Sequence, residues 1–72
     1  MGFQSRLRAL RTERNMNQTA LAQAIGVTLK QIQRYELGHN EPTLSVLVAL
    51  ADAFDVSLDY LTGRTENPEI NR

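Results

Sequence analysis

The side chains best suited to binding chemistry are concentrated in one short stretch, residues 28–34. It holds Thr28, Lys30, Gln31, Gln33 and Arg34, which carry hydroxyl, ammonium, amide and guanidinium groups. A guanidinium or an amide makes paired hydrogen bonds to a base edge, and an ammonium neutralises a phosphate. This set of donors indicates recognition of a polar, negatively charged partner.

Residues suited to catalysis are sparse by comparison. The chain has one histidine, His39, and no cysteine, which excludes both a disulfide framework and a thiolate zinc site. It has no phosphate-cradling glycine loop, serine-nucleophile motif or zinc-protease motif. We interpret Asp52, Asp55 and Asp59 as a solvated acidic face. We therefore expect no enzyme activity, no metal site, no cofactor and no small-molecule ligand.

Length and composition predict one small globular domain. The chain has 72 residues, of which 42% are hydrophobic and 22% charged, which is ordinary for a globular protein. Its longest apolar run, residues 46–51, is far too short to cross a bilayer. The sequence begins without a basic-then-apolar leader. We expect a cytoplasmic protein that does not bind membranes.

The formal net charge of zero conceals an uneven distribution along the chain. Residues 1–38 carry six cationic and two acidic side chains, and residues 39–72 carry two cationic and six acidic ones. A domain that is basic at one end and acidic at the other is suited to docking on a polyanion by one face. This interpretation requires that the two halves of the sequence also separate in space.

Apolar spacings of three and four predict an all-α protein of five short helices. Residues that cap helices mark their ends. The predicted helices run from Phe3 to near Asn15, between Asn17 and Gly26, over about 29–37, between Thr43 and Asp55, and between Ser57 and Gly63. The widest apolar stripe is in the fourth of these, at Leu44, Leu47, Leu50, Ala51 and Phe54. Residues 64–72 are polar and predict a flexible C-terminal tail.

The second and third predicted helices form a closely crossed pair. Ala22 is small enough for two backbones to approach, and Gly26 allows a left-handed turn four residues later. Ile32 and Tyr35, three residues apart, face inward on the third helix. The other side of that helix presents the polar residues Lys30, Gln31, Gln33 and Arg34.

With this pair in place, the sequence resembles the helix-turn-helix domains of the phage lambda repressor and Cro type, the Xre-like family. The resemblance covers roughly residues 3–63. It implies a compact five-helix domain over 1–63 that regulates transcription as a symmetric dimer on a palindromic DNA site, with the recognition helix at about 28–37. The matching residues are Gln18, Leu21, Ala22, Ile25, Gly26, Val27, Ile32, Arg34, Glu36, Gly38, Pro42, Leu47, Ala51, Val56 and Leu61.

The resemblance also implies roles for individual residues. Those expected to reach base edges in the major groove are Thr28, Leu29, Lys30, Gln33 and Arg34. Those expected to contact phosphates are Asn17, Gln18, Gln31 and Asn40. Two alternatives stay open: Gln31 contacts a phosphate or a base, and Arg34 grips a guanine or a phosphate.

Two residues depart from the family pattern. Leu29 is apolar where a polar residue is usual, and it either packs on a thymine methyl or lies against a neighbouring side chain. Asp55 stands where Gly or Asn often ends the fourth helix. Asp tolerates the left-handed conformation, so we expect only a small loss of stability there.

Other residues are expected to be structural. By resemblance, Arg11 and Glu36 form an ion pair between the first and third helices, and Leu58 contacts a second subunit. We expect one of the three large residues of the last helix to be exposed, and Leu37 as well. Arg6, Arg8 and Arg14 are interpreted as solvated surface that adds to the field attracting phosphate.

Two functions from different classes are compatible with these residues. The favoured one is a homodimeric, sequence-specific binder of double-stranded DNA that acts as a transcriptional regulator, with repressor as the preferred role. The alternative is a protein-interaction module of the same fold, such as an antitoxin or an accessory factor. Overall neutrality and the apolar Leu29 and Leu37 support the alternative.

Overall fold

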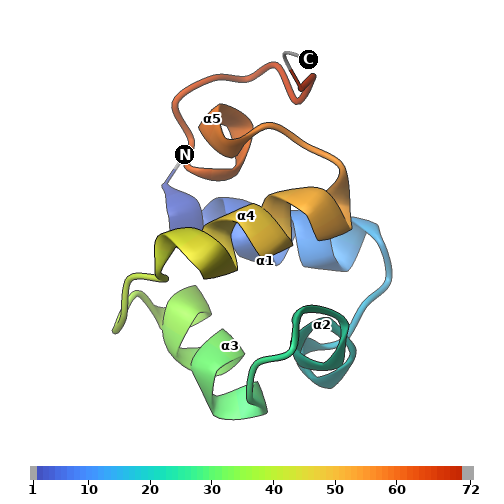
Figure 1. Cartoon of the computed structure of the whole chain (residues 1–72), viewed down its shortest axis with the longest axis vertical. Coiled ribbons are helices and arrows are strands. Elements are labelled where there is room, and N and C mark those ends of the chain that lie inside the picture. The colour runs from blue at the N-terminus through green and yellow to red at the C-terminus, as the bar shows by residue number, and fades with distance from the viewer. Residues whose placement is uncertain (1, 71–72) are drawn as a thin grey trace.

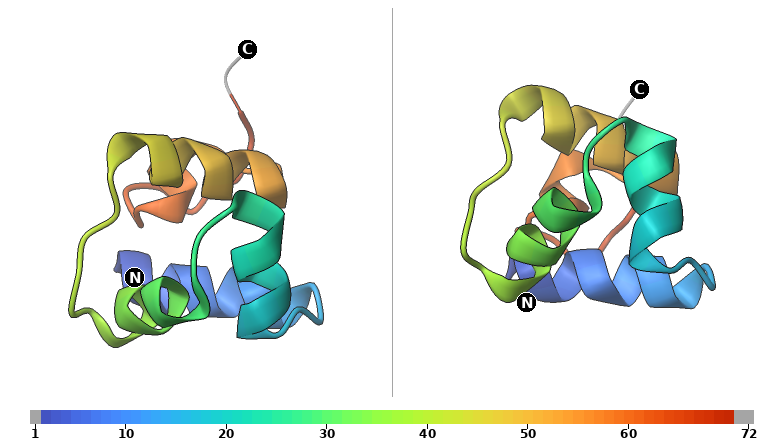
Figure 2. Two further views of the ribbon diagram at one scale, coloured as in Figure 1. Left: turned by 60° about the horizontal axis from the view of Figure 1, so that its bottom comes forward. Right: turned by 90° about the horizontal axis from the view of Figure 1, so that it is seen from below.

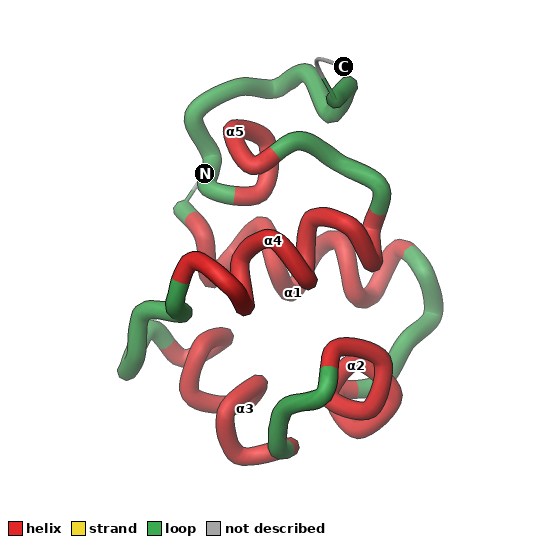
Figure 3. Tube along the Cα trace, in the orientation of Figure 1, coloured by secondary structure: helices red, strands yellow, loops and turns green. Residues whose placement is uncertain are grey.

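All regular structure in the described part of the chain is helical (Figure 1). The computed structural model describes residues 2–70. Its elements are α1 (Phe3–Glu13), α2 (Gln18–Ile25), α3 (Leu29–Leu37), α4 (Leu44–Phe54) and α5 (Leu58–Leu61). Within residues 2–70 no strand forms, and loops join the five helices (Figure 3). The predicted all-α, five-helix domain is confirmed.

Four polar side chains cap the N-termini of helices at the positions predicted from the sequence. Asn17, Thr28, Thr43 and Ser57 each accept a hydrogen bond from the backbone N–H three residues later. This N-cap bond satisfies a donor that has no partner within the helix. At Thr28 the cap is reciprocal, because the Gln31 side chain also accepts from the Thr28 backbone N–H at 2.9 Å. This capping box fixes the first turn of α3.

The turn between α2 and α3 depends on Gly26. Gly26 has φ +75°, and a Cβ added there would meet no heavy atom within 4 Å. The glycine is therefore needed for its backbone conformation and not for space. Ala22, which is buried, lies one turn earlier. The predicted tight connection holds α3 against α2.

The helices surround one core of buried apolar residues. α3 packs against both α1 and α2, α4 packs against α2 and α5, and α1 also contacts α5 (Figure 2). The residues of this core are Leu7, Leu10, Leu21, Ala22, Ile32, Tyr35, Leu50, Ala51, Phe54, Val56 and Leu61. Each large side chain that is fully buried in the core stabilises the fold by roughly 1.5–3 kcal/mol.

The apolar stripe of α4 is shorter than predicted. Leu44 is 71% exposed, whereas Leu50, Ala51 and Phe54 are buried. Leu44 is the first residue of α4, and the buried residues lie in the later turns of the helix. The periodicity of the sequence predicts Leu44 as part of this stripe, but the core does not extend to the beginning of the helix, so Leu44 is exposed.

The interpretation of Arg6 as solvated surface is wrong. Its side chain is 3% exposed, and its guanidinium carbon lies 3.8 Å from the centre of the Tyr60 ring. Its Nη2 donates to Glu66 at 3.2 Å. The face of an aromatic ring attracts a cation, which makes this position compatible with burial. Arg6 thus joins α1 to α5 and to the segment that follows α5.

Arg14 also has a structural partner, although it remains exposed. Its Nη2 donates to the backbone carbonyl of Phe54 at 2.7 Å. Phe54 is the last residue of α4, so a cation is placed against the negative end of that helix. Such a contact is stabilising because the last carbonyls of a helix lack partners within it.

Residues 64–70 lie against the domain. The Ser57 backbone N–H donates to the Pro68 carbonyl at 2.9 Å, and Ile70 lines a hollow with Val48 and Leu58. The flexibility of the segment over 64–72 stays a prediction. Residues 1, 71 and 72 lie outside the described part of the chain.

Candidate nucleic-acid interface

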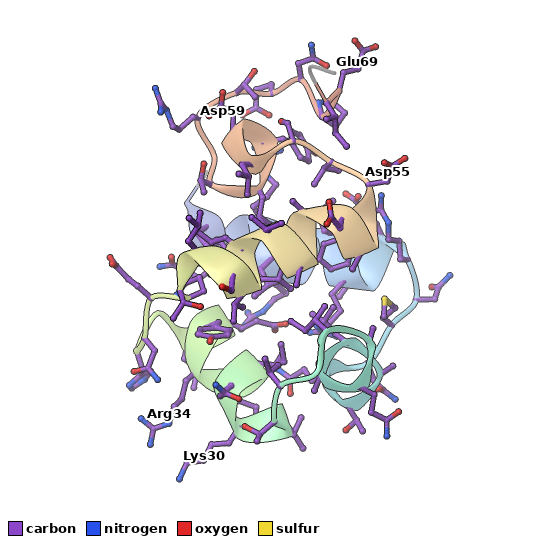
Figure 4. All side chains as sticks on the ribbon, in the orientation of Figure 1. Lys30, Arg34, Asp55, Asp59 and Glu69 are labelled. Carbon is purple, nitrogen blue, oxygen red and sulfur yellow. The ribbon has the colours of Figure 1, made fainter. Side chains whose placement is uncertain are left out.

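The outward side of α3 presents four neighbouring side chains to solvent. Leu29, Lys30, Gln33 and Arg34 are all exposed, whereas Ile32 faces the core. Figure 4 shows Lys30 and Arg34 extending away from the body of the domain. Because the helix places residues three and four apart on one face, these side chains project together. The sequence correctly predicted which side of the helix is outward.

The polar members of this group are free of internal partners. Within residues 2–70, the side chains of Lys30, Gln33 and Arg34 form no hydrogen bond or ion pair with the rest of the chain. With Leu37 and His39 they line an open hollow beside α3. Their donors are available to an external partner and need no internal rearrangement to bind it.

Part of the charge separates along the long axis of the molecule, although Arg6 and Arg64 lie with Glu66 and Asp59 at the largely acidic end (Figure 4). Lys30 and Arg34 lie at the α3 end, and Asp55, Asp59 and Glu69 lie toward the opposite end (Figure 4). The domain measures 30 Å along this axis and 21–22 Å across it. A dipolar distribution of this kind orients the α3 end toward a polyanion.

The residues expected to contact phosphates differ in their surroundings. Asn17 accepts from the Ala20 backbone N–H at 2.7 Å, and the Gln18 amide donates to Glu36 at 3.2 Å. Gln31 is the half-buried partner of Thr28 in the capping box. Asn40 is exposed in the loop after α3. Asn17, Gln18 and Gln31 thus have structural roles as well, whereas Asn40 is open to solvent.

A buried carboxylate joins three helices behind this surface. Glu36 is on α3, its side chain is 1% exposed, and it accepts from Arg11 Nε at 2.7 Å and from Arg11 Nη2 at 3.0 Å. Arg8 Nε, 3.4 Å away, and the Gln18 amide donate to the same carboxylate oxygen, Oε1. We call these four residues the Glu36 cluster. The expected ion pair between Arg11 and Glu36 is present, and two further donors surround it.

The cluster determines how its charged groups titrate. Burial acts to raise the pKa of Glu36, but the hydrogen bonds from Arg11, Gln18 and Arg8 outweigh it, so the pKa lies below its ordinary value. The hydrogen bond that Arg11 donates to Glu36 raises the pKa of Arg11. Both groups are therefore charged at neutral pH, and the carboxylate is fully paired.

Sequence reasoning missed the contributions of Arg8 and Gln18 to this cluster. The resemblance indicated only the Arg11–Glu36 pair, and Arg8 was interpreted as solvated surface. A signal was nevertheless present, because Arg8 and Arg11 are three residues apart and share one side of α1. An acid that faces one of them is within reach of the other.

Neither a metal-binding cluster nor a membrane-spanning helix is present in the described residues. No group of three or more histidine, cysteine, aspartate or glutamate side chains in residues 2–70 is arranged to hold a metal ion. In the same residues no helix is long and apolar enough to span a membrane.

The sequence pattern of the helix-turn-helix family matches residues 7–61. The chain belongs to this family. The match includes α2, the turn at Gly26 and all of α3, the elements that build the exposed surface described above. The resemblance to repressors of the lambda type is thereby confirmed.

This helix-turn-helix domain is similar in sequence to named transcriptional regulators. It is 38% identical, over 97% of its length, to the cryptic phage CTXphi transcriptional repressor RstR of Vibrio cholerae, and it covers 65% of that protein. A regulator of Bacillus subtilis, YobD, is 39% identical over 89% of the chain and 57% of its own length. The chain thus spans about three fifths of the curated relatives that it matches.

Among solved structures, the P22 c2 repressor in complex with a synthetic operator has the same fold. The TM-score is 0.82 with 34% identity, and the match covers 86% of this chain and 94% of the repressor chain. The helix-turn-helix domain is therefore similar in both sequence and structure to a repressor that was crystallised in complex with a synthetic operator.

Proposed function

We propose that this helix-turn-helix domain binds double-stranded DNA sequence-specifically as a transcriptional regulator, with repressor as the preferred role. The observation that carries this proposal is the free, exposed group of Lys30, Gln33 and Arg34 on α3. These residues stand at the basic end of a dipolar domain. Similarity to the transcriptional repressor RstR and to the P22 c2 repressor supports the proposal.

In this proposal α3 enters the major groove. Lys30, Gln33 and Arg34 meet base edges directly, and exposed Leu29 is placed to contact a thymine methyl. Thr28 contacts DNA at the first turn of α3 while it caps the helix. The backbone N–H groups at the beginning of α2, with Asn17 and Gln18, meet phosphates on one side, and Gln31 and Asn40 meet further phosphates.

A symmetric homodimer on a palindromic site completes the proposal. Among the large side chains of α5, Leu61 is buried and Tyr60 half-buried, whereas Leu58 is 39% exposed. One exposed large residue is what the sequence predicts for this helix. We assign Leu58 to the contact between subunits. Two recognition helices about one DNA turn apart would then read the two half-sites.

A different observation favours the second candidate, a protein-interaction module. Leu37 is 64% exposed at the end of α3, next to the proposed DNA surface. An apolar side chain in that position suits a protein partner better than it suits phosphate. The two candidates differ in one measurable property, the selection of a DNA sequence.

The test is selection from a randomised duplex pool followed by gel shift. Enrichment of a palindromic sequence by the wild-type chain is expected, and Arg34→Ala and Gln33→Ala should each lose the preference at the base position that the side chain contacts. Arg64→Ala, which removes an exposed arginine far from α3, is the matched control and should keep the preference. No enrichment at low salt by a folded chain would favour the protein-interaction module.

A further inference from the structure

The Glu36 cluster contains one more cationic side chain than its carboxylate neutralises. Arg11 makes two hydrogen bonds to Glu36, and its side chain is only 14% exposed. This bidentate pairing matches one guanidinium with the one carboxylate. Arg8 makes a single longer contact through Nε, and its side chain is 57% exposed. The uncompensated charge of the cluster is therefore on Arg8, at the surface.

The anchoring of Arg8 leaves its outer donors free. Its Nε is held at 3.4 Å from the Glu36 carboxylate, and within residues 2–70 no other acidic side chain pairs with it. The two terminal NH₂ groups remain for an external acceptor. A guanidinium held through Nε loses less side-chain entropy on binding than one that is free to rotate.

Arg8 and Gln18 meet at the same carboxylate oxygen, Glu36 Oε1. Arg8 comes from the middle of α1 and Gln18 from the first turn of α2. The Gln18 amide has two N–H donors, and Glu36 accepts from this group once. Glu36 thus holds two donors from different helices next to each other.

This pair lies beside the part of α3 proposed to read DNA. Leu29, Gln33 and Glu36 are spaced four and three residues apart and form one stripe along α3. Arg8 and Gln18 gather at the end of that stripe. Lys30 and Arg34 lie on the neighbouring side of α3, where they line the hollow with His39, and Gln33 stands between the two sides because it also lines this hollow. When α3 is in a groove, one sugar-phosphate strand passes each side of it.

We propose that Arg8, together with Gln18, binds a phosphate of the DNA backbone on the α1 side of α3, with Glu36 as the positioning residue. This inference rests on the proposed function and adds to it a residue of α1. The terminal N–H groups of Arg8 donate to the phosphate oxygens, and the charge of Arg8 displaces a counterion from the DNA. The phosphate contact is independent of base sequence.

The experiment compares Arg8→Gln with Arg64→Gln, and measures affinity for duplex DNA as a function of salt concentration. Arg64 is also an exposed arginine with a single acidic neighbour, and that neighbour, Asp59, lies at the end of the molecule away from α3 (Figure 4). Both variants therefore change the net charge by the same amount. Arg8→Gln is expected to bind roughly tenfold more weakly, with the slope of log K against log salt reduced by about 0.9. Arg64→Gln is expected to keep the wild-type slope.

A third variant, Arg8→Lys, separates charge from folding. Lysine keeps the positive charge, so the salt slope should remain that of the wild type. Arg11 is unchanged in every variant and is expected to keep both of its bonds to Glu36, and thermal unfolding of each should confirm a folded domain. Equal slopes for Arg8→Gln and wild type would overturn the phosphate contact. Equal losses in Arg8→Gln and Arg64→Gln, or a slope for Arg8→Lys as low as that of Arg8→Gln, would overturn it as well.

The proposed function fails in a different way. A folded wild-type chain that binds no duplex at any salt concentration would overturn DNA binding itself, and the phosphate contact with it. Wild-type binding with an unchanged slope in Arg8→Gln would overturn only the role of Arg8.

Discussion

Two regions of the domain each bury a charged side chain, and they stabilise it differently. Glu36, between α1, α2 and α3, is surrounded by charged and polar donors that satisfy both carboxylate oxygens. Arg6, between α1, α5 and residues 64–70, has the Tyr60 ring and one ion pair with Glu66, a side chain that is 84% exposed. Arg6 Nε is buried and has no hydrogen-bond partner among residues 2–70.

The contacts of Glu36 depend strongly on geometry, whereas the contact of Arg6 with the Tyr60 ring depends on it weakly. Hydrogen bonds to a carboxylate depend on distance and angle, so the Glu36 cluster fixes the orientation of α3 relative to α1 and α2. An arginine over an aromatic ring tolerates small shifts, and an exposed partner adds little energy. The more rigid of the two arrangements lies behind the surface proposed to bind DNA. The more tolerant one lies at the acidic end.

The strongest test of this comparison is Glu36→Ala. We expect a loss of about 3–5 kcal/mol in the free energy of unfolding, because Arg11 would remain largely buried without its partner. Urea unfolding followed by circular dichroism measures it. A loss below about 1 kcal/mol would contradict the central role of this carboxylate.

The pH dependence of stability should identify the same group. The pKa of Glu36 in the folded domain lies below its ordinary value, so the unfolded chain takes up a proton at higher pH than the folded one. The stabilisation from Glu36 is thus fully present above the ordinary pKa and is lost as the pH falls through the folded pKa. Urea unfolding at a series of acidic pH values should show a decline for the wild type. Glu36→Gln should show a flatter profile; parallel profiles for the two chains would exclude Glu36 as the cause.

The corresponding change at the other site is Arg6→Met, which replaces the buried cation with an unbranched apolar side chain. We expect the free energy of unfolding to change by at most about 1 kcal/mol. The variant removes an unpaired buried N–H, and a thioether also packs well on an aromatic ring. Urea unfolding beside Glu36→Ala gives the comparison directly. Similar losses in the two variants would mean that the two buried charges are equivalent.

The smallest effect is expected for Glu66→Gln, which removes the acid of an ion pair that is mostly in solvent. The loss should be at most about 1 kcal/mol and should disappear at high salt. Urea unfolding at low and high salt concentration measures both. A loss of several kcal/mol that persists at high salt would show that Arg6 depends on Glu66 and not on Tyr60.

Much of the fold could be predicted because its signals are local. Asn17, Thr28 and Thr43 act on N–H groups three residues away, and Gly26 fixes the turn by its own backbone conformation. The outward side of α3 also follows from residue spacing within one helix. Such features involve residues only a few positions apart, so they can be predicted from the sequence without knowing how distant segments pack.

The rest depends on contacts between distant segments. Glu66 is 60 residues from Arg6, and Tyr60 belongs to a helix of only four residues, so nothing near Arg6 indicates its burial. Leu44 follows the periodicity of α4 but lies beyond the end of the core. Arg8 has a favourable position on α1, yet its proximity to Gln18 arises only from the way α1, α2 and α3 meet at Glu36.

The most direct test of DNA reading by α3 is selection of duplex sequences by the wild type, Arg34→Ala and Arg64→Ala side by side. The wild type and Arg64→Ala should enrich the same palindrome, and Arg34→Ala should lose preference at one position of each half-site, by about 1–3 kcal/mol. Enrichment of an identical palindrome by all three folded chains would contradict base reading by Arg34. Absence of any enrichment by the wild type would contradict sequence-specific binding altogether.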